Sequence, residues 1–323
     1  MTRIFLFLLL IFNCTLNYAQ QKDTLGVKTQ LFKINEQLSY AYSKPKFFDM
    51  FRDIPKDIID FGKYTVQKKN LLPVGIAVAS TGILIPFDQS LIENAVTLGG
   101  KIGWDNEGTY ARISGMRILP SNIPAAVYYI GNGGTTLFLS GGFYAFGKIN
   151  NDYRALNTAS ELVEVLLSVG VVSQTIKRIT GRQSPIRAMK TGNPGGHWTP
   201  FPSFKAYQTD TPNYDAIPSG HVATFMATVT VIATNYPEKK WIKPVGYSLM
   251  GTLAFQMMSS KVHWASDYPV AILIGYVIGK NAAKRRIKEY QQVKIGSQEM
   301  NFKTNYTISN LYGDTVVGVR ITF

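Results

Sequence analysis

The stretch Pro218-Ser219-Gly220-His221 stands directly before an apolar segment that begins at Val222. Serine is a favourable helix N-cap, and the free backbone amides of a helix start bind anions. Glycine lets a ligand approach the backbone closely, and an imidazole at His221 can reach the leaving-group oxygen of a bound phosphate. The four residues therefore predict a helix start at the edge of an anion site. An ordinary capped helix with an exposed histidine accounts for them equally well.

A second stretch, His263-Trp264-Ala265-Ser266-Asp267, places an imidazole and a carboxylate four residues apart. On a helix this spacing puts both side chains on one face. We therefore expect Asp267 to accept the ring N–H of His263 on the same helix, which leaves the other ring nitrogen free as a nucleophile. Taken alone, the spacing is more common in ordinary surface pairs.

Basic residues mark a third segment, which closes a helix expected from about residue 158 and reads Lys177-Arg178-Ile179-Thr180-Gly181-Arg182-Gln183-Ser184-Pro185. Cations at the end of an apolar helix can neutralise phosphate oxygens and stabilise the charge of a transition state. Such a cluster is also an ordinary feature of helix ends. All three segments lie at expected helix ends, where a short bundle can bring them together.

Taken together, the three segments resemble the superfamily of type-2 phosphatidic acid phosphatases, bacterial class A acid phosphatases and vanadium haloperoxidases. The family pattern is Lys, six residues, Arg-Pro; then Pro-Ser-Gly-His; then Ser-Arg, five residues, His, three residues, Asp. The resemblance covers roughly residues 158–283 of this chain. It implies that His263 attacks phosphorus to form a phosphohistidine and that Asp267 orients His263. It also implies that His221 protonates the leaving oxygen and later activates water.

The same resemblance implies a phosphate cradle that needs no metal and no other cofactor. In it, Lys177, the hydroxyl of Ser219 and the amide of Gly220 hold the phosphoryl oxygens. The sequence contains no carboxylate or Cys/His cluster spaced like a metal site, which agrees with this implication.

Two positions depart from the family pattern, because Ser184 and Met257 stand where the family has phosphate-binding arginines. Removing one oxyanion-type donor costs an enzyme on the order of 100- to 1,000-fold in rate. Nearby cations could supply the missing charge. We therefore expect phosphate contacts from Arg182, Arg187 and Lys261.

Long apolar stretches predict an all-α fold, a bundle of about six helices followed by a short C-terminal β-hairpin. Each stretch is about helix length, and several approach the ~20 residues needed to cross a bilayer. They cover residues 71–87, 123–146, 158–176, 222–236, 245–258 and 268–283. We assign residues 71–290 to this helical domain. Residues 299–323 alternate around a turn, which predicts the hairpin.

The N-terminal part has the character of a targeting and surface segment. Residues 1–20 have a charged tip, an apolar run and a small residue near the end, which is the layout of a secretory signal peptide. Residues 21–70 read as a polar leader that ends in an amphipathic helix over residues 47–69. The single cysteine, Cys14, lies inside the signal peptide, so we expect no disulfide in the mature chain.

The chain of 323 residues carries a formal net charge of +14, which favours anionic partners. No basic-aromatic motif indicates nucleic acid. Lysine and arginine clusters follow two apolar stretches at the same expected end of the bundle, as the positive-inside rule describes. We therefore expect a bacterial-type cell-envelope protein, in a membrane, with its site facing the periplasm. Its expected partner is a lipid phosphate or another phosphomonoester or diphosphate. The positive-inside rule places residues 63–70 on the cytoplasmic side, whereas a cleaved signal peptide would place them outside. Either one apolar stretch does not cross, or the bundle lies outside the inner membrane.

The function that these features favour is metal-independent hydrolysis of a lipid phosphate or polyprenyl diphosphate through a phosphohistidine. Two alternatives stay open. A non-catalytic envelope protein that binds anionic lipid would explain Ser184 and Met257. Vanadate-dependent halide oxidation would use the same frame, although it needs a richly cationic pocket. Hydrolysis ranks first because the residues for attack, orientation and proton transfer are all present.

Overall fold

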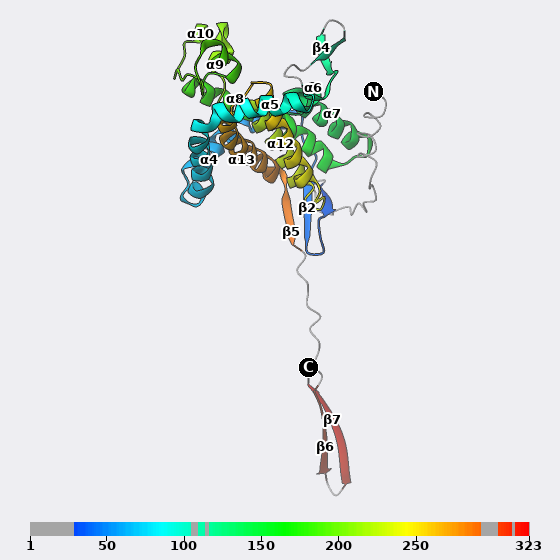
Figure 1. Ribbon diagram of the computed structural model, residues 1–323. Helices are drawn as coiled ribbons and strands as arrows, with labels where there is room; N and C mark the ends of the chain where they lie inside the picture. The colour runs from blue at the N-terminus through cyan, green and yellow to red at the C-terminus, as the bar shows by residue number, and fades with distance from the viewer. Residues whose placement is uncertain (1–28, 105–108, 114–115, 292–302, 312–313, 323) are drawn as a thin grey trace.

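The computed structural model describes residues 29–104, 109–113, 116–291, 303–311 and 314–322, and this part is mostly helical (Figure 1). The longer helices are α3 (Ile54–Val66), α4 (Leu71–Leu84), α5 (Asp88–Lys101), α7 (Gly133–Ile149), α8 (Tyr153–Thr180), α11 (Gly220–Asn235), α12 (Ile242–Ser259) and α13 (Tyr268–Arg286). The shorter ones are α2 (Asp49–Arg52), α6 (Ile123–Ile130), α9 (Pro185–Thr191) and α10 (Phe204–Thr209). Single 3-10 turns are η1 (Lys68–Asn70), η2 (Ile85–Phe87), η3 (Thr211–Asn213) and η4 (Ala265–Asp267).

Helices α8, α11 and α13 form the centre of the fold. Their buried faces share one hydrophobic core, which includes Leu162, Val222 and Ile274. Helix α13 approaches α11 closely at Gly275, where a Cβ atom would stand 2.2 Å from the carbonyl oxygen of Ala223. Because real Cβ atoms do not come so near, only glycine lets the two helices pack in this way. This packing holds the beginnings of α11 and α13 next to each other.

Strands add three small antiparallel units to the helices. β1 (Thr29–Lys33), β2 (Leu38–Ser43) and β5 (Lys288–Gln291) form a sheet in the order β1-β2-β5. β3 (Tyr110–Ile113) pairs with β4 (Met116–Pro120), and β6 (Lys303–Leu311) pairs with β7 (Asp314–Thr322). The rings of Phe32 and Tyr42 pack with Tyr153 and Leu156 of α8, so the three-stranded sheet rests on the bundle.

The expected all-α class is too narrow, because the fold is mostly helical with a small antiparallel sheet. Part of the segment read as a polar leader forms β1 and β2, whose partner β5 lies far along the chain. A bundle of about six helices is also too small, since the structure adds α5, α9 and α10. The six apolar stretches are helical, with α6 and α7 separated at Gly131. The expected amphipathic helix corresponds to α2 and α3, and the expected C-terminal hairpin to β6 and β7. The signal peptide at residues 1–20 lies outside the described residues.

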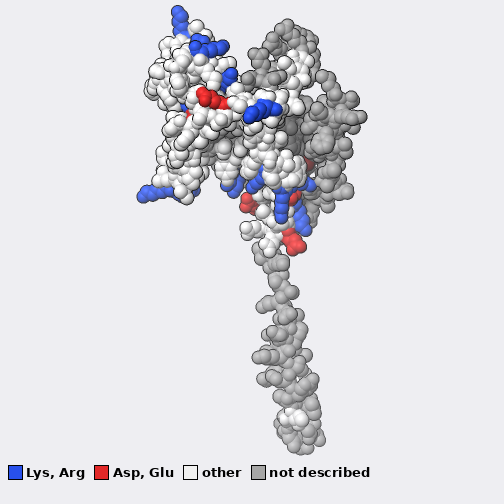
Figure 2. Space-filling view, viewed as in Figure 1, with Lys and Arg blue, Asp and Glu red and all other residues white. Residues whose placement is uncertain are grey.

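The surface of α4 is apolar and open. Leu72, Ile76 and Ile83 are 74%, 58% and 66% exposed. Figure 2 shows an uncharged surface over α4, and lysine or arginine side chains appear only at the lower end of this region. Two helical stretches of the described part are long and apolar enough to cross a membrane, the hardly buried Lys68–Lys101 and the mostly buried Tyr153–Thr180. Since a core helix of a soluble protein passes the same test, they weakly suggest a membrane association.

Candidate active site

His221 and His263 lie side by side, with their ring centroids 6.2 Å apart. His221 is the second residue of α11, and His263 lies in the loop before η4. A backbone hydrogen bond joins the two segments, because the amide of Ser219 donates to the carbonyl oxygen of Asp267 at 3.1 Å. The two stretches that the sequence singles out therefore meet at one place.

Asp267 lies within reach of His263, with its Oδ2 atom 3.3 Å from Nδ1 of the imidazole. The expectation that both residues share one helix is wrong. His263 precedes the turn η4, and α13 begins only at Tyr268, with a proline in its first turn. Trp264 is extended, and its amide donates to Oδ2 of Asp267 at 2.8 Å. Asp267 thus caps its own turn, and this turn brings it to the imidazole.

A buried guanidinium, that of Arg182, lies on the other side of Asp267. Its Nη1 atom donates to Oδ1 of Asp267 at 2.8 Å, and its Nη2 atom donates to Oδ2 of Asp88 at 2.6 Å. All three side chains are completely buried. Asp88 also accepts the backbone amide of Ser266 at 3.0 Å, which ties it to η4. Both terminal nitrogens of Arg182 are therefore engaged by carboxylates.

Asp88 was missed by the sequence reasoning. It is the first residue of α5, and an acidic residue is ordinary in the first turn of a helix. Nothing in the residues around it signals a partner. Its role becomes visible only when α5 packs beside η4, so that Asp88 meets Arg182 and Ser266.

A cavity of about 400 Å³ opens beside His221, and His263 lies behind this residue rather than in the cavity lining. Lys177, Gly220 and His221 form its polar end. Val169 and Gly170 also line it, about two turns earlier on α8, so the cavity extends roughly 12 Å along this helix. The Lys177 end of the cavity is therefore suited to an anionic group, whereas the rest of its lining combines Val169 and Gly170 with the polar side chains of Asn132, Ser173 and Gln174.

Residues 158–288 match the model of the PAP2 superfamily. The chain carries a PAP2 superfamily domain. This finding confirms the resemblance seen in the three motif segments. No curated protein and no solved structure matches the chain. The PAP2 match spans Lys177, His221, His263 and Asp267, whereas Asp88 lies before it.

Of the cations expected to bind phosphate in the PAP2 domain, Lys177 lines the cavity. It is 6% exposed, and its Nζ atom lies 3.5 Å from the carboxylate of Asp215. Arg182 is held behind Asp267, and Arg187 is ion-paired at the surface. The carbonyl oxygen of Lys261 accepts a hydrogen bond from the amide of Ile186, in the first turn of α9. Phosphate contacts by these last three residues stay predictions.

The two positions where the PAP2 pattern has arginine are part of the protein interior. Met257 is completely buried in the core between α11, α12 and α13. Ser184 is 4% exposed, and its hydroxyl finds no hydrogen-bond partner within the described residues. Neither residue supplies charge to the site, so more of the expected phosphate binding falls to Lys177.

His221 is tightly surrounded at the start of α11. The ring of Tyr128 lies against it, with a centroid distance of 4.6 Å, and Gly131 comes so close that a Cβ atom there would stand 2.9 Å from Cβ of His221. The hydroxyl of Ser219 accepts the amide of Val222 at 3.4 Å and caps the helix. Burial, followed by the neighbouring His263 and Lys177, lowers the pKa of His221 to about 3. His221 is therefore neutral at pH 7 in the free site.

Replacing Asp88 by Asn is expected to lower kcat by about 10- to 100-fold, because a small displacement of Asp267 misaligns His263. KM should stay nearly unchanged, since Asp88 does not line the cavity. Steady-state kinetics below the melting temperature of each variant measure both constants. The control is Glu93→Gln, an exposed carboxylate on the same helix. A kcat equal to that of the control would refute this positioning role.

Binding of tungstate, a phosphate-like dianion, is expected to take up protons at the site. A bound dianion favours the charged imidazole and so raises the pKa of His221 from its low value. Protons are then taken up below the raised pKa, and affinity falls as the pH rises through it. Calorimetry at about pH 5.5 in two buffers of different ionisation enthalpy measures this uptake. His221→Gln should lose it and His197→Gln should keep it; equal uptake in both variants contradicts the assignment.

Proposed function

We propose that this protein is a phosphatase in which His263 accepts a phosphoryl group from a lipid phosphate or polyprenyl diphosphate. The PAP2 superfamily domain supports phosphatase-type activity on phosphate esters. The observation that carries the proposal is the buried chain of contacts from Asp88 through Arg182 and Asp267 to His263. It presents one imidazole beside a second, His221, at the polar end of a cavity.

In the proposed reaction the Nε2 atom of His263 attacks phosphorus, and the bond from phosphorus to the leaving oxygen breaks. His221, protonated once the anionic substrate is bound, gives its proton to that oxygen. It is then neutral and takes a proton from water, which attacks phosphorus and breaks the bond to His263. Lys177 and the amide of Gly220 stabilise the phosphoryl oxygens throughout.

Substrate binding in this scheme requires a local rearrangement. His263 is only 4% exposed, whereas His221 and Lys177 line the cavity. A phosphoryl group that enters from the cavity meets these two side chains first. A side-chain shift of His221 away from Tyr128 would open the path to His263. The Lys177–Asp215 contact, at 3.5 Å, would loosen as the phosphate replaces the carboxylate.

The preference for a lipid rests on the shape of the cavity and on the surface around it. The cavity leads from Lys177 to Val169 and Gly170 on α8. On the same helix, Leu167 and Val171 are 38% and 47% exposed, so an acyl or prenyl chain can continue along an apolar surface. The proposed setting is a membrane of a bacterial-type cell envelope, with the site on its periplasmic side.

The decisive experiment compares phosphate release by the wild type and by His263→Ala, in detergent with a chelator. The panel contains lipid phosphates, polyprenyl diphosphates and water-soluble phosphomonoesters. We expect the variant to lose at least on the order of 1,000-fold in rate, because it removes the nucleophile. His197→Ala is the matched control, since it removes an exposed histidine outside the cavity.

Equal release by the wild type and His263→Ala would remove the enzyme proposal and favour a non-catalytic envelope role. Activity that disappears with chelator would instead overturn only the metal-free mechanism. In the part of the chain that the structure describes, no group of three His, Cys, Asp or Glu residues is arranged to hold a metal ion.

The lipid preference has its own test at Gly170, where a Cβ atom would meet nothing within 4 Å. Gly170→Leu would fill the part of the cavity beside Val169 and should raise KM for a long-chain lipid phosphate by about tenfold. KM for a water-soluble phosphomonoester should change by no more than about twofold, because only the polar end of the cavity receives it. Gly251→Leu, at an equally open position on α12, is the control. Equal changes for both substrates would contradict the lipid assignment.

A further inference from the structure

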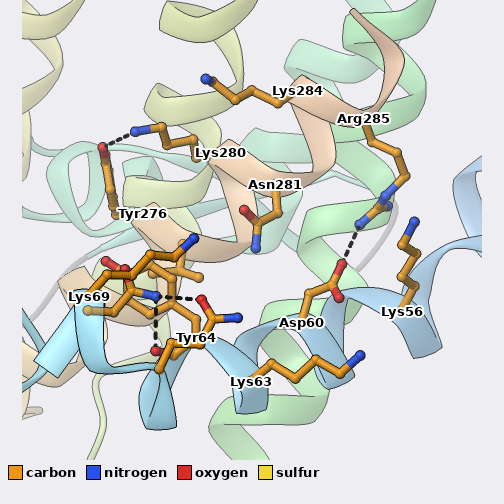
Figure 3. A pocket seen from close by; sticks show the side chains of 13 residues that line it. Lys56, Asp60, Lys63, Tyr64, Lys69, Tyr276, Lys280, Asn281, Lys284 and Arg285 are labelled. Atoms are coloured by element: carbon orange, nitrogen blue, oxygen red, sulfur yellow. Dashed lines mark hydrogen bonds and ion pairs between the residues drawn. The ribbon is translucent and has the colours of Figure 1, made fainter.

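A second pocket, of about 640 Å³, lies between α3, η1 and α13 (Figure 3). It is separate from the proposed active site, because no residue lines both cavities. Helix α13 begins beside Asp267, and its pocket residues Lys280 and Lys284 follow Tyr268 by 12 and 16 residues. At ~1.5 Å per residue, these lysines stand roughly 18 to 24 Å from the site end of the helix.

The pocket is strongly cationic. Six basic side chains line it, against one carboxylate, that of Asp60. Arg285 is already satisfied, since it donates to Asp57 at 2.5 Å and to Glu164 at 2.8 Å. The lysines differ from it, because within the described residues none of them is ion-paired. They are Lys56, Lys63, Lys69, Lys280 and Lys284.

The pocket also offers neutral donors and an apolar border. Lys280 donates to the hydroxyl of Tyr276 at 2.8 Å, and Figure 3 shows this pair facing Tyr64 and Lys69 across the pocket. Directly after η1, helix α4 begins with Leu71 and Leu72, which are 53% and 74% exposed. A ligand that fits both features has an anionic head and an apolar tail.

We propose that this pocket binds the headgroup of an anionic phospholipid, with the acyl chains lying along α4. Lysine ammonium groups attract the phosphodiester, while the exposed side chains of α4 replace water around the chains. Free phosphate shares the charge but not the tail, so it would leave the α4 surface uncovered. The bound lipid would fix α3 against α13 at the end of the bundle opposite the PAP2 site.

The test measures the melting temperature of the full chain in neutral detergent during titration with dioctanoyl phosphatidylglycerol. This phosphodiester is no phosphomonoester substrate, so the readout does not depend on turnover. Each lysine near an anionic lipid contributes about fivefold in affinity, so the triple variant Lys63→Gln/Lys280→Gln/Lys284→Gln should weaken the apparent Kd on the order of 100-fold. The triple variant Lys33→Gln/Lys240→Gln/Lys243→Gln, which changes the net charge equally outside the pocket, should respond like the wild type.

Two further arms decide between ligands. Dioctanoyl phosphatidylcholine, which has no net charge, should give little shift. Asp60→Asn, which removes the carboxylate of the pocket, should bind phosphatidylglycerol more tightly than the wild type. Equal responses of the two lysine variants would overturn the proposal. If inorganic phosphate raised the melting temperature of the wild type but not of the Lys63→Gln/Lys280→Gln/Lys284→Gln variant, the lipid assignment would be overturned. This variant should retain phosphatase activity in lipid-free detergent.

Discussion

The carboxylate of Asp267 is the group on which the rest of the site depends. One oxygen receives the amide of Trp264 and faces His263, and the other receives Arg182. A completely buried carboxylate is stable only when its oxygens are satisfied in this way. Since α13 starts at the next residue, the same contacts that orient the imidazole also begin a central helix of the core. The site and the fold are therefore built on one turn.

The buried ions support the nucleophilic role that we propose for His263. Two carboxylates and one guanidinium leave an excess negative charge behind the imidazole. In the proposed reaction, positive charge would develop on the ring as Nε2 bonds to phosphorus, and this negative environment would stabilise it. The rings of Trp198 and Trp264, centred 4.9 and 5.3 Å from the guanidinium, keep water away from Arg182. Buried ion pairs seldom add net stability, so orientation of the histidine is the better account of this network.

How much the sequence predicts depends on whether a contact is local. The cap at Ser219 follows from a short pattern, because a helix start carries its geometry with it. The four-residue spacing correctly indicated that Asp267 lies near His263, but not the geometry that brings them together. For Arg182, sequence proximity to the motif gives a charge but not the direction of the guanidinium, which is turned towards Asp88 and Asp267. Asp88 and the β1-β2-β5 sheet were missed because their partners come from distant segments. The expected shared helix failed for a local reason, since the turn before α13 brings Asp267 to His263 without helical spacing.

The reduced phosphate cradle and the shape of the cavity are consistent with each other in the proposed function. Met257 and Ser184 give no charge, so in this proposal Lys177 and the amide of Gly220 would hold a phosphoryl group with fewer ionic contacts than the PAP2 pattern provides. Binding energy from a part of the substrate that does not react can instead position the reacting centre. The stretch of cavity toward Val169 supplies this for an acyl or prenyl chain. A small phosphate ester cannot use this binding energy. The absence of the two arginines would therefore lower the rate of hydrolysis most for such a substrate.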